Sequence, residues 1–173
     1  MQIRYLDLFL VNKKFKKIEK KWLFIFDVDG VLTDGKFSYT ENGKYSKDFG
    51  SHDADALKLL SKFSQIVFIT ADNRGLGITK RRLQDMGFSV KIVEPANRVD
   101  MIKKLQTDYY IVYVADSFTD CQALKAANLS FTPRNANFLA KKSSNYVLKS
   151  EGGSGAVAEV CLLYLLANNR GII

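Results

Sequence analysis

The sequence is poor in the residues that build disulfides, zinc sites and proline-rich linkers. Its 173 residues include only two cysteines, two prolines and one histidine. Cys121 and Cys161 stand alone and lack the paired spacing of metal ligands, so a histidine–cysteine zinc site is excluded. Two isolated thiols are typical of a reducing compartment, and we expect a cytoplasmic protein. Because 47% of the residues are hydrophobic, the composition predicts a globular domain with a substantial core.

Long apolar runs are also missing. No stretch approaches the roughly 20 apolar residues that a membrane-spanning helix needs. The short apolar run 6–11 is interrupted by Asp7 and lacks the small-residue cleavage site of a secretory signal. We therefore expect a soluble protein without a membrane partner.

Acidic residues are outnumbered by basic residues, and the excess of positive charge is concentrated at one end. The net charge is +8, and residues 1–21 hold seven basic and two acidic residues, a local charge of +5. Such a leader can attract nucleic acid or an anionic membrane, but more often it is a solvated arm or the exposed face of a short helix. The rest of the chain has no RNA-binding aromatic motif and no helix-turn-helix pattern, which argues against nucleic acid as a partner. We divide the chain into this basic leader, 1–21, and a single domain, 22–173.

Strand-like and helix-like patterns alternate along the domain. The strand candidates are short apolar runs at 22–26, 66–70, 90–93, 110–114, 129–131 and 146–148. The helix candidates lie at 54–63, 74–86, 98–106, 119–127, 136–142 and 155–167. This alternation predicts an α/β fold of the Rossmann-like, doubly wound type, in which helices cover both faces of a parallel sheet.

One segment, 36–48, departs from this alternation. Aromatic and polar residues alternate there around Asn42-Gly43, which is the strongest short signal for a β-hairpin. Phe37 and Tyr39 would then share one face of the ribbon. A hairpin inserted after the first strand lies at the ligand-binding end of the sheet, where it could be a lid or could pair with another subunit.

The first strand candidate runs directly into two carboxylates, Asp27 and Asp29. If the strand ends near Asp27, both lie at the edge where open α/β sheets bind ligands. One aspartate there can act as a nucleophile, and a second one two residues later can transfer protons. The alternative is an ordinary strand followed by an Asp-Gly turn.

Polar residues also follow three later strand candidates: Thr70, then Arg98, then Asp116 with Asp120. Each has an ordinary alternative, since Thr70 and the aspartates could cap helices and Arg98 could be a surface charge. The carboxyl ends of parallel strands share one edge, so we expect the clusters to converge. Their chemistry fits phosphoryl transfer, with a hard divalent cation such as Mg²⁺ to neutralise the crowded carboxylates.

This ordered set of motifs resembles that of the haloacid dehalogenase (HAD) superfamily of phosphatases. The residues that carry the resemblance are the run Asp27-Val28-Asp29-Gly30-Val31, Thr70, the basic residue Arg98, and the run from Asp116 to Asp120. Within the superfamily, the sequence is similar to the cap-less branch of 3-deoxy-D-manno-octulosonate (KDO) 8-phosphate and nonulosonate 9-phosphate phosphatases. That narrower resemblance rests on residues 27–35, the hairpin turn 41–43, Asp53 with 56–60, and the glycine-rich run 152–160.

The resemblance implies an Mg²⁺-dependent phosphomonoesterase that acts on a small acidic sugar phosphate through an aspartyl phosphate. Asp27 would be the nucleophile, and Asp29 would be the general acid/base. Asp27, Asp29 through its backbone carbonyl, and Asp116 would hold Mg²⁺, with Asp120 in support. Members of this branch are homotetramers whose hairpins help to cover neighbouring active sites, so a homotetramer is expected here.

The resemblance also assigns residues to the phosphate and the sugar. Thr70 and Arg98 would bind phosphate. His52, Asp53 and Ala71 are candidate substrate contacts, although a hydrogen-bonded structural role is the alternative for His52, which stands where the branch usually has arginine. The glycine-rich run is expected near the mouth of the active site.

Three motif positions depart from the family pattern. Arg98 replaces the usual lysine, Ala71 replaces the usual glycine, and the fourth motif begins Ala115-Asp116-Ser117 instead of with glycine. These changes keep the nucleophile and the acid/base but could slow turnover or alter the substrate. The alternative function is therefore a catalytically weakened assembly or regulatory module with the same fold.

Overall fold

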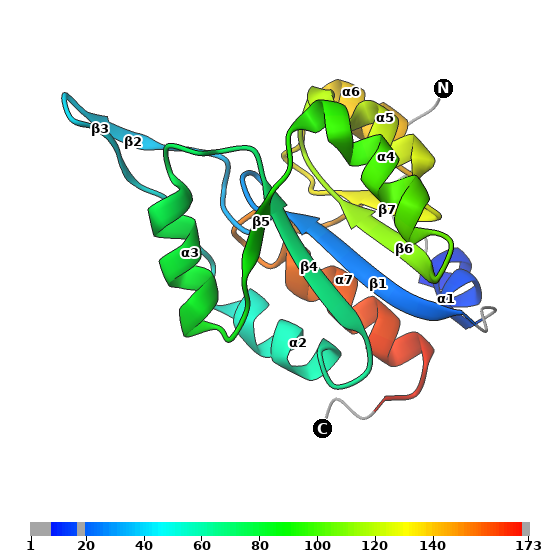
Figure 1. Cartoon of the computed structure of the whole chain (residues 1–173). Helices are drawn as coiled ribbons and strands as arrows, with labels where there is room; N and C mark the ends of the chain where they lie inside the picture. The colour runs from blue at the N-terminus through cyan, green and yellow to red at the C-terminus, as the bar shows by residue number, and fades with distance from the viewer. Residues whose placement is uncertain (1–7, 17–19, 171–173) are drawn as a thin grey trace.

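A six-stranded parallel sheet forms the centre of the molecule (Figure 1). The computed structural model describes residues 8–16 and 20–170. Within these ranges the strand order is β5-β4-β1-β6-β7-β8, and every neighbouring pair is parallel. The strands are β1 (Lys21–Asp27), β4 (Gln65–Thr70), β5 (Val90–Ile92), β6 (Tyr109–Val114), β7 (Leu129–Thr132) and β8 (Tyr146–Val147). The predicted Rossmann-like α/β fold is confirmed, and the described residues form no large cap.

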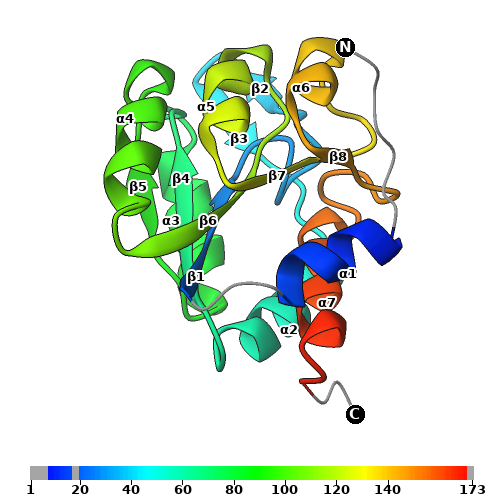
Figure 2. The ribbon, with the colours of Figure 1, turned by 90° about the vertical axis from the view of Figure 1, so that its right-hand side faces the viewer.

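Helices cover both faces of this sheet (Figures 1 and 2). One face carries α1 (Leu8–Lys16), α2 (His52–Leu60), α3 (Leu76–Asp85) and α7 (Ala156–Ala167). The other face carries α4 (Pro95–Leu105), α5 (Cys121–Ala126) and α6 (Phe138–Ser143), and a 3₁₀ turn, η1 (Phe118–Asp120), leads into α5. Within the described ranges, no helix is both long and apolar enough to cross a membrane.

The central strand β1 is apolar along most of its length because it is buried on both sides. Phe24 and Phe26 pack in the cluster under α2 and α7, whereas Leu23 and Ile25 pack in the cluster under α4 and α5. All four are at most 2% exposed. Successive strand residues point to opposite faces, so a strand covered on both faces appears in the sequence as a continuous hydrophobic run.

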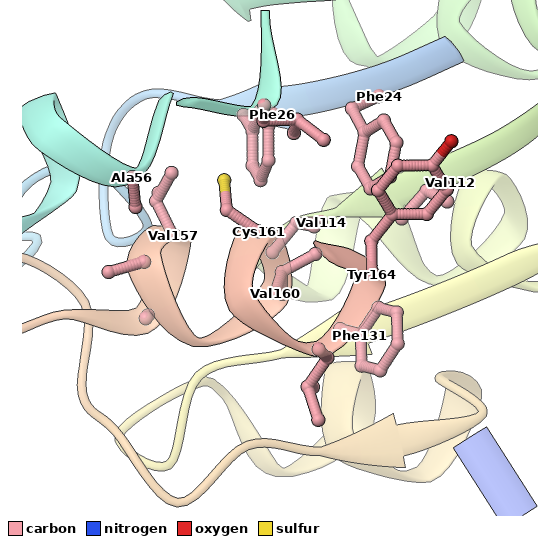
Figure 3. Packing of buried hydrophobic residues seen from close by; sticks show 14 of the residues in the cluster. Phe24, Phe26, Ala56, Val112, Val114, Phe131, Val157, Val160, Cys161 and Tyr164 are labelled. Atoms are coloured by element: carbon pink, nitrogen blue, oxygen red, sulfur yellow. The ribbon is translucent and has the colours of Figure 1, made fainter. Parts of the chain in front are cut away.

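Helix α7 is a main cover of the first face (Figure 3). Nine of its twelve residues are buried, which explains why its sequence is apolar on nearly every side. Tyr164 packs edge-on against Phe24 of β1, with ring centroids 5.2 Å apart. The helix therefore ties residues late in the chain to the first strand of the sheet.

Part of the basic leader is a helix that packs into the core. In α1, Val11 is fully buried, and Phe15 is 1% exposed and lies 5.5 Å from the Tyr164 ring. The lysines of α1 are exposed. This part of the leader is thus a short helix with a charged outer face, which was one of the alternatives predicted for it. The inner face of the helix belongs to the core. Residues 1–7 and 17–19 lie outside the described residues, and the division of the chain after the leader stays a prediction.

The predicted hairpin is present. It consists of β2 (Ser38–Thr40) and β3 (Gly43–Ser46), which pair in antiparallel fashion and project from the carboxyl end of the sheet (Figure 1). Gly43 has a φ of +110°, a conformation that favours glycine in the turn. Phe37 precedes β2, and the register shifts between Ser38 and Tyr39, so the simple alternation expected for Phe37 and Tyr39 is interrupted.

The strand order places a ligand-binding position at the end of β1. From β1 the chain adds β4 and β5 on one side and then crosses back to add β6, β7 and β8 on the other. In open α/β sheets, ligands bind outside the carboxyl ends of the strands where the order switches in this way. The two aspartates that follow β1 lie at this point.

Candidate active site

The polar clusters predicted from the sequence meet at the carboxyl edge of the sheet. Asp27 and Thr70 are the last residues of β1 and β4, Arg98 lies in the first turn of α4, and Asp116 and Asp120 follow β6. A cleft of about 350 Å³ opens between these segments. Of the predicted site residues, those that line the cleft are Asp27, Asp29, Ala71, Arg98, Asp116 and Asp120.

Arg98 is a buried cation between two carboxylates. It is 2% exposed. Its Nη2 lies 3.3 Å from Oδ1 of Asp27, and its Nη1 lies 2.6 Å from Oδ1 of Asp120. Burial by itself would lower the pKa of the guanidinium. The negative charge of Asp27, with that of Asp120, outweighs burial and raises the pKa above its ordinary value, so the group stays charged. The alternative that Arg98 is a surface charge is therefore wrong.

Tyr113 is a site residue that the sequence analysis did not single out. It lies on β6, is fully buried, donates from its hydroxyl to Oδ1 of Asp120 and accepts from Nη1 of Arg98 at 3.3 Å. Burial raises the pKa of the phenol well above its usual range. The available signal was weak: a tyrosine inside a buried strand needs a partner for its hydroxyl.

The cleft is lined by five aspartates but by only two basic residues, Lys44 and Arg98. Burial raises the pKa of Asp27 well above its ordinary value, even though Arg98 opposes the shift. The pKa of Asp116 is raised to about 6 by burial and by the charge of Asp120. The Oδ2 atom of Asp120 is buried without a hydrogen-bond partner. Crowded carboxylate oxygens of this kind are the donors that a hard divalent cation binds.

The residues expected to hold Mg²⁺ fit that donor set. The expected ligands are two carboxylates, Asp27 and Asp116, and the backbone carbonyl of Asp29. In the part of the chain that the structure describes, no three His, Cys, Asp or Glu side chains are already grouped as a metal site. A two-carboxylate set completed by a carbonyl and water does not require such a group. Asp120 is engaged by Arg98 and Tyr113 through one oxygen, which suits a supporting place.

Gly30 allows the carboxylate of Asp116 to reach the loop after β1. Its φ is +80°, and a Cβ at this position would lie 2.0 Å from Oδ2 of Asp116. Any side chain here would displace the carboxylate or the loop. The Asp27-Val28-Asp29-Gly30 sequence therefore brings two acidic residues to the cleft and leaves room for a third.

Asp29 is held by groups from two other segments. Thr70 Oγ1 donates to its Oδ2 at 3.0 Å, and Nζ of Lys47 lies 2.6 Å from its Oδ1. The Thr70 hydroxyl also accepts the backbone N–H of Asp72 at 2.9 Å. Thr70 does not cap α3, whose N-cap is Gly75. Its single proton points to Asp29, so its predicted phosphate contact would require the hydroxyl to turn.

Two lysines of the hairpin form a second buried cluster that sequence reasoning missed. Nζ of Lys44 and Nζ of Lys47 lie 2.5 and 2.8 Å from Oδ2 of Asp72. Burial would raise the pKa of Asp72, but hydrogen bonds from both lysines outweigh it and lower the pKa to about 2. Lys44 and Phe37 line the cleft, so the hairpin contributes to the wall of its own site. Polar residues in a hairpin look solvent-exposed in a sequence, and no signal placed them beside Asp72.

His52 and Asp53 do not line the cleft of this chain, and their expected substrate contact stays a prediction. Asp53 is fully buried, and its Oδ1 accepts the backbone N–H of Ala158 at 2.8 Å. Burial raises its pKa to about 6. His52 is exposed at the start of α2. The rotation of α2 turns Asp53 toward α7, so its contact within the chain is structural. Ala71, the third candidate substrate contact, does line the cleft.

The glycine-rich run supports the loop after β1. A Cβ on Gly152 would lie 2.0 Å from the backbone oxygen of Gly30. The N–H of Gly152 donates to Oδ1 of Asn135 at 2.9 Å, and the N–H of Gly153 donates to the carbonyl of Val31 at 3.1 Å. Both N–H groups are used inside the protein. The run lies beside the active-site loop, as expected, and acts there by close backbone packing.

Several known proteins that are similar to this chain in sequence and fold are phosphatases. No family model matches the chain. It is 30% identical to the KDO 8-phosphate phosphatase KdsC of Haemophilus influenzae over 163 residues, which cover 91% of this chain and 90% of that protein. It is 31% identical to KdsC of Escherichia coli K12 over 160 residues, or 89% of this chain and 84% of that protein.

Solved structures agree. The KDO 8-phosphate phosphatase of Moraxella catarrhalis, in complex with magnesium, phosphate and KDO, has a TM-score of 0.80 and 27% identity over 93% of this chain and 94% of that one. The cobalt-bound YrbI phosphatase of Haemophilus influenzae has a TM-score of 0.76 and 27% identity over 87% of this chain and 91% of that one. The chain therefore belongs to the KDO 8-phosphate phosphatase (KdsC) family, a family of phosphatases within the HAD superfamily.

Proposed function

We propose that the chain hydrolyses a small acidic sugar phosphate, of the KDO 8-phosphate or nonulosonate 9-phosphate type, through an aspartyl phosphate and with Mg²⁺. The observation that carries this proposal is the arrangement of Asp27, Arg98 and Asp120 at the end of β1, beside Asp29 and Asp116 in one cleft. The relatives named for KDO 8-phosphate support the substrate class.

Asp27 is the proposed nucleophile. Arg98 holds its Oδ1 at 3.3 Å, so we assign the attack on phosphorus to Oδ2. As the Oδ2–P bond forms and the bond from phosphorus to the sugar oxygen breaks, Asp29 gives its proton to that oxygen. Asp29 then takes a proton from water, which attacks the aspartyl phosphate and releases inorganic phosphate.

Asp27, Asp116 and the backbone carbonyl of Asp29 would hold Mg²⁺, with Asp120 in support. The ion, when bound, neutralises these carboxylates and draws negative charge from the phosphate. The raised pKa values of Asp27 and Asp116 support this assignment, because burial and crowding work against their ionisation when no cation is present. Arg98 would contact the phosphate from the wall of the cleft, and the Thr70 hydroxyl would reach it by turning from Asp29.

A homotetramer built around the hairpins is also proposed. Tyr39 is 57% exposed and Tyr45 is 73% exposed, and both lie on the hairpin that projects from the body (Figure 1). Exposed aromatic side chains on a projecting ribbon favour packing against other copies. Light scattering should give the mass of a tetramer, and Tyr39→Lys with Tyr45→Lys should lower it. A parent protein with the mass of a monomer would contradict the assembly.

The direct test is phosphate release by Asp27→Asn. With KDO 8-phosphate or a nonulosonate 9-phosphate and Mg²⁺, we expect kcat to fall by at least about 10³-fold, because the amide cannot form the covalent intermediate. The matched control is Asp85→Asn, an exposed position in α3. Equal turnover by parent and Asp27→Asn would refute the assignment. If the parent released no phosphate in a metal-dependent way from any sugar or aryl phosphate, the weakened regulatory module would be favoured instead.

A further inference from the structure

The hairpin places a fully buried lysine against the carboxylate of Asp29. The Lys47 side chain is 0% exposed, and its Nζ lies 2.6 Å from Oδ1 of Asp29 and 2.8 Å from Oδ2 of Asp72. It also donates to Thr79 Oγ1 at 2.9 Å. These contacts place the ammonium group between two carboxylates and a hydroxyl, with ion pairs to the aspartates and a hydrogen bond to Thr79. Lys47 does not line the cleft, so it does not face a bound substrate.

Both oxygens of Asp29 are fixed by this arrangement. Lys47 holds Oδ1, and the Thr70 hydroxyl holds Oδ2 at 3.0 Å. The two contacts orient the carboxylate before phosphate binds, and the Lys47 contact is the one that remains when the Thr70 hydroxyl turns to the phosphate. Proton transfer to a leaving oxygen requires an acid within hydrogen-bond reach and correctly oriented, so a small displacement of Asp29 would slow it.

Asp72 in turn holds Lys47. A single buried ammonium is costly, and it is retained where carboxylates offset its charge. Asp72 supplies one of the two carboxylates around Lys47 and also binds Lys44 at 2.5 Å. Its backbone N–H donates to the Thr70 hydroxyl at 2.9 Å, which closes a ring of contacts around Asp29.

We propose that Lys47 is a positioning residue that keeps Asp29 oriented for proton transfer, and that Asp72 keeps Lys47 in place. This inference rests on the proposed function, in which Asp29 is the general acid/base. Full burial of Lys47 excludes direct binding of the sugar. A lysine that only fastened the hairpin to α3 through Thr79 would leave the proton-transfer step unchanged.

The test compares two leaving groups. The alkoxide released from KDO 8-phosphate needs a proton, whereas the phenolate released from p-nitrophenyl phosphate needs little help. General acids contribute about 10²- to 10⁴-fold, so Lys47→Met should lower kcat/KM by about 10- to 100-fold for KDO 8-phosphate and by less than about 3-fold for the aryl phosphate. The control Lys36→Met, whose side chain is 87% exposed, should change neither value.

A double-mutant cycle then shows whether Lys47 acts through Asp29. Asp29→Asn alone should show the same selective loss, and adding Lys47→Met to it should cause no further selective loss. If Lys47→Met fails to fold, Asp72→Asn replaces it and should shift the ratio of the two kcat/KM values in the same direction.

The outcomes separate the two proposals. If Asp29→Asn keeps full activity on KDO 8-phosphate, the proposed acid/base is wrong and this inference falls with it. Suppose that Asp29→Asn lowers kcat/KM mainly for KDO 8-phosphate, but that the Lys47 or Asp72 variant lowers kcat/KM equally for both substrates. Only the positioning role of Lys47 is then overturned. Additive losses in the double mutant would overturn it as well, because they would show that Lys47 acts at another point.

Discussion

Replacing Gly152 by alanine should destabilise the protein and disturb the loop that carries Asp29. The new Cβ would lie 2.0 Å from the oxygen of Gly30 and 2.7 Å from the oxygen of Thr33. Both are backbone atoms, which cannot rotate away, and Cβ contacts under 3.0 Å are essentially never seen. Overpacking costs about 1–3 kcal/mol, and we expect the upper end, about 3 kcal/mol, because backbone lies on the other side of the contact.

Thermal unfolding followed by circular dichroism measures this effect. For a domain of this size, 1 kcal/mol corresponds to a change in Tm of roughly 2–4 °C, so the variant should melt about 6–12 °C below the parent. Gly77→Ala is the matched control, since nothing lies within 4 Å of its added Cβ. Alanine is favoured over glycine in helices by up to about 1 kcal/mol, so this variant should melt at or slightly above the parent temperature.

The activity of Gly152→Ala should fall as well. The kcat of the variant should be lower than that of the parent even at temperatures well below the Tm of the variant. The new Cβ displaces the backbone of Gly30, and this loop also carries Asp29. The reasoning is refuted if Gly152→Ala melts with the parent and retains its kcat. That result would mean that the glycine-rich run does not support the active-site loop.

Three further changes test the core and the charges. Phe15→Ala should lower the free energy of unfolding by about 3–5 kcal/mol in a denaturant titration, because it removes a buried ring; a negligible change would show that α1 is not part of the core. Arg98→Met should lower it by about 3–5 kcal/mol, since Asp27 and Asp120 would lose their buried cation, and a more stable variant would contradict this. Burial raises the pKa of Asp53 from 3.8 to about 6, so between these values the folded protein holds a proton that the unfolded chain has lost. Its free energy of unfolding should therefore fall by up to about 3 kcal/mol as the pH rises from about 4 to about 6. Asp53→Asn should remove that decrease in urea titrations across this range, and an unchanged pH dependence would count against the assignment.

The sheet and the acidic edge could be predicted because both depend on local patterns. A strand covered on both faces must be apolar throughout, so β1, β4 and β6 were located to within a residue or two. The convergence of Asp27, Arg98 and Asp116 follows from topology alone, since parallel strands end at the same edge. Burial of Arg98 rules out a surface charge, and the N-cap of η1 is Ser117 and not Asp116, whereas Asp120 does stand at the N-cap of α5, without a side-chain capping bond.

The contacts that could not be predicted depend on how elements are rotated and docked. Lys47 reaches Asp29 and Asp72 only because the chain just after β3 docks beside them, and this docking is not encoded in the turn sequence of the hairpin. Asp53 lies in the first turn of α2, where either the cleft or α7 could have been its neighbour. Phe15 was hidden among lysines, and only tertiary packing shows that its side of α1 is buried.

The contact between α1 and α7 has a consequence for the order in which the protein can fold during synthesis. Phe15 lies 5.5 Å from the ring of Tyr164, so the burial of α1 cannot be completed until residue 164 has been made. The loop after β1 must likewise wait for Gly152. Long-range contacts of this kind slow folding and leave apolar segments exposed in the meantime. A nascent chain that stops short of α7 should therefore be a substrate for chaperones and proteases.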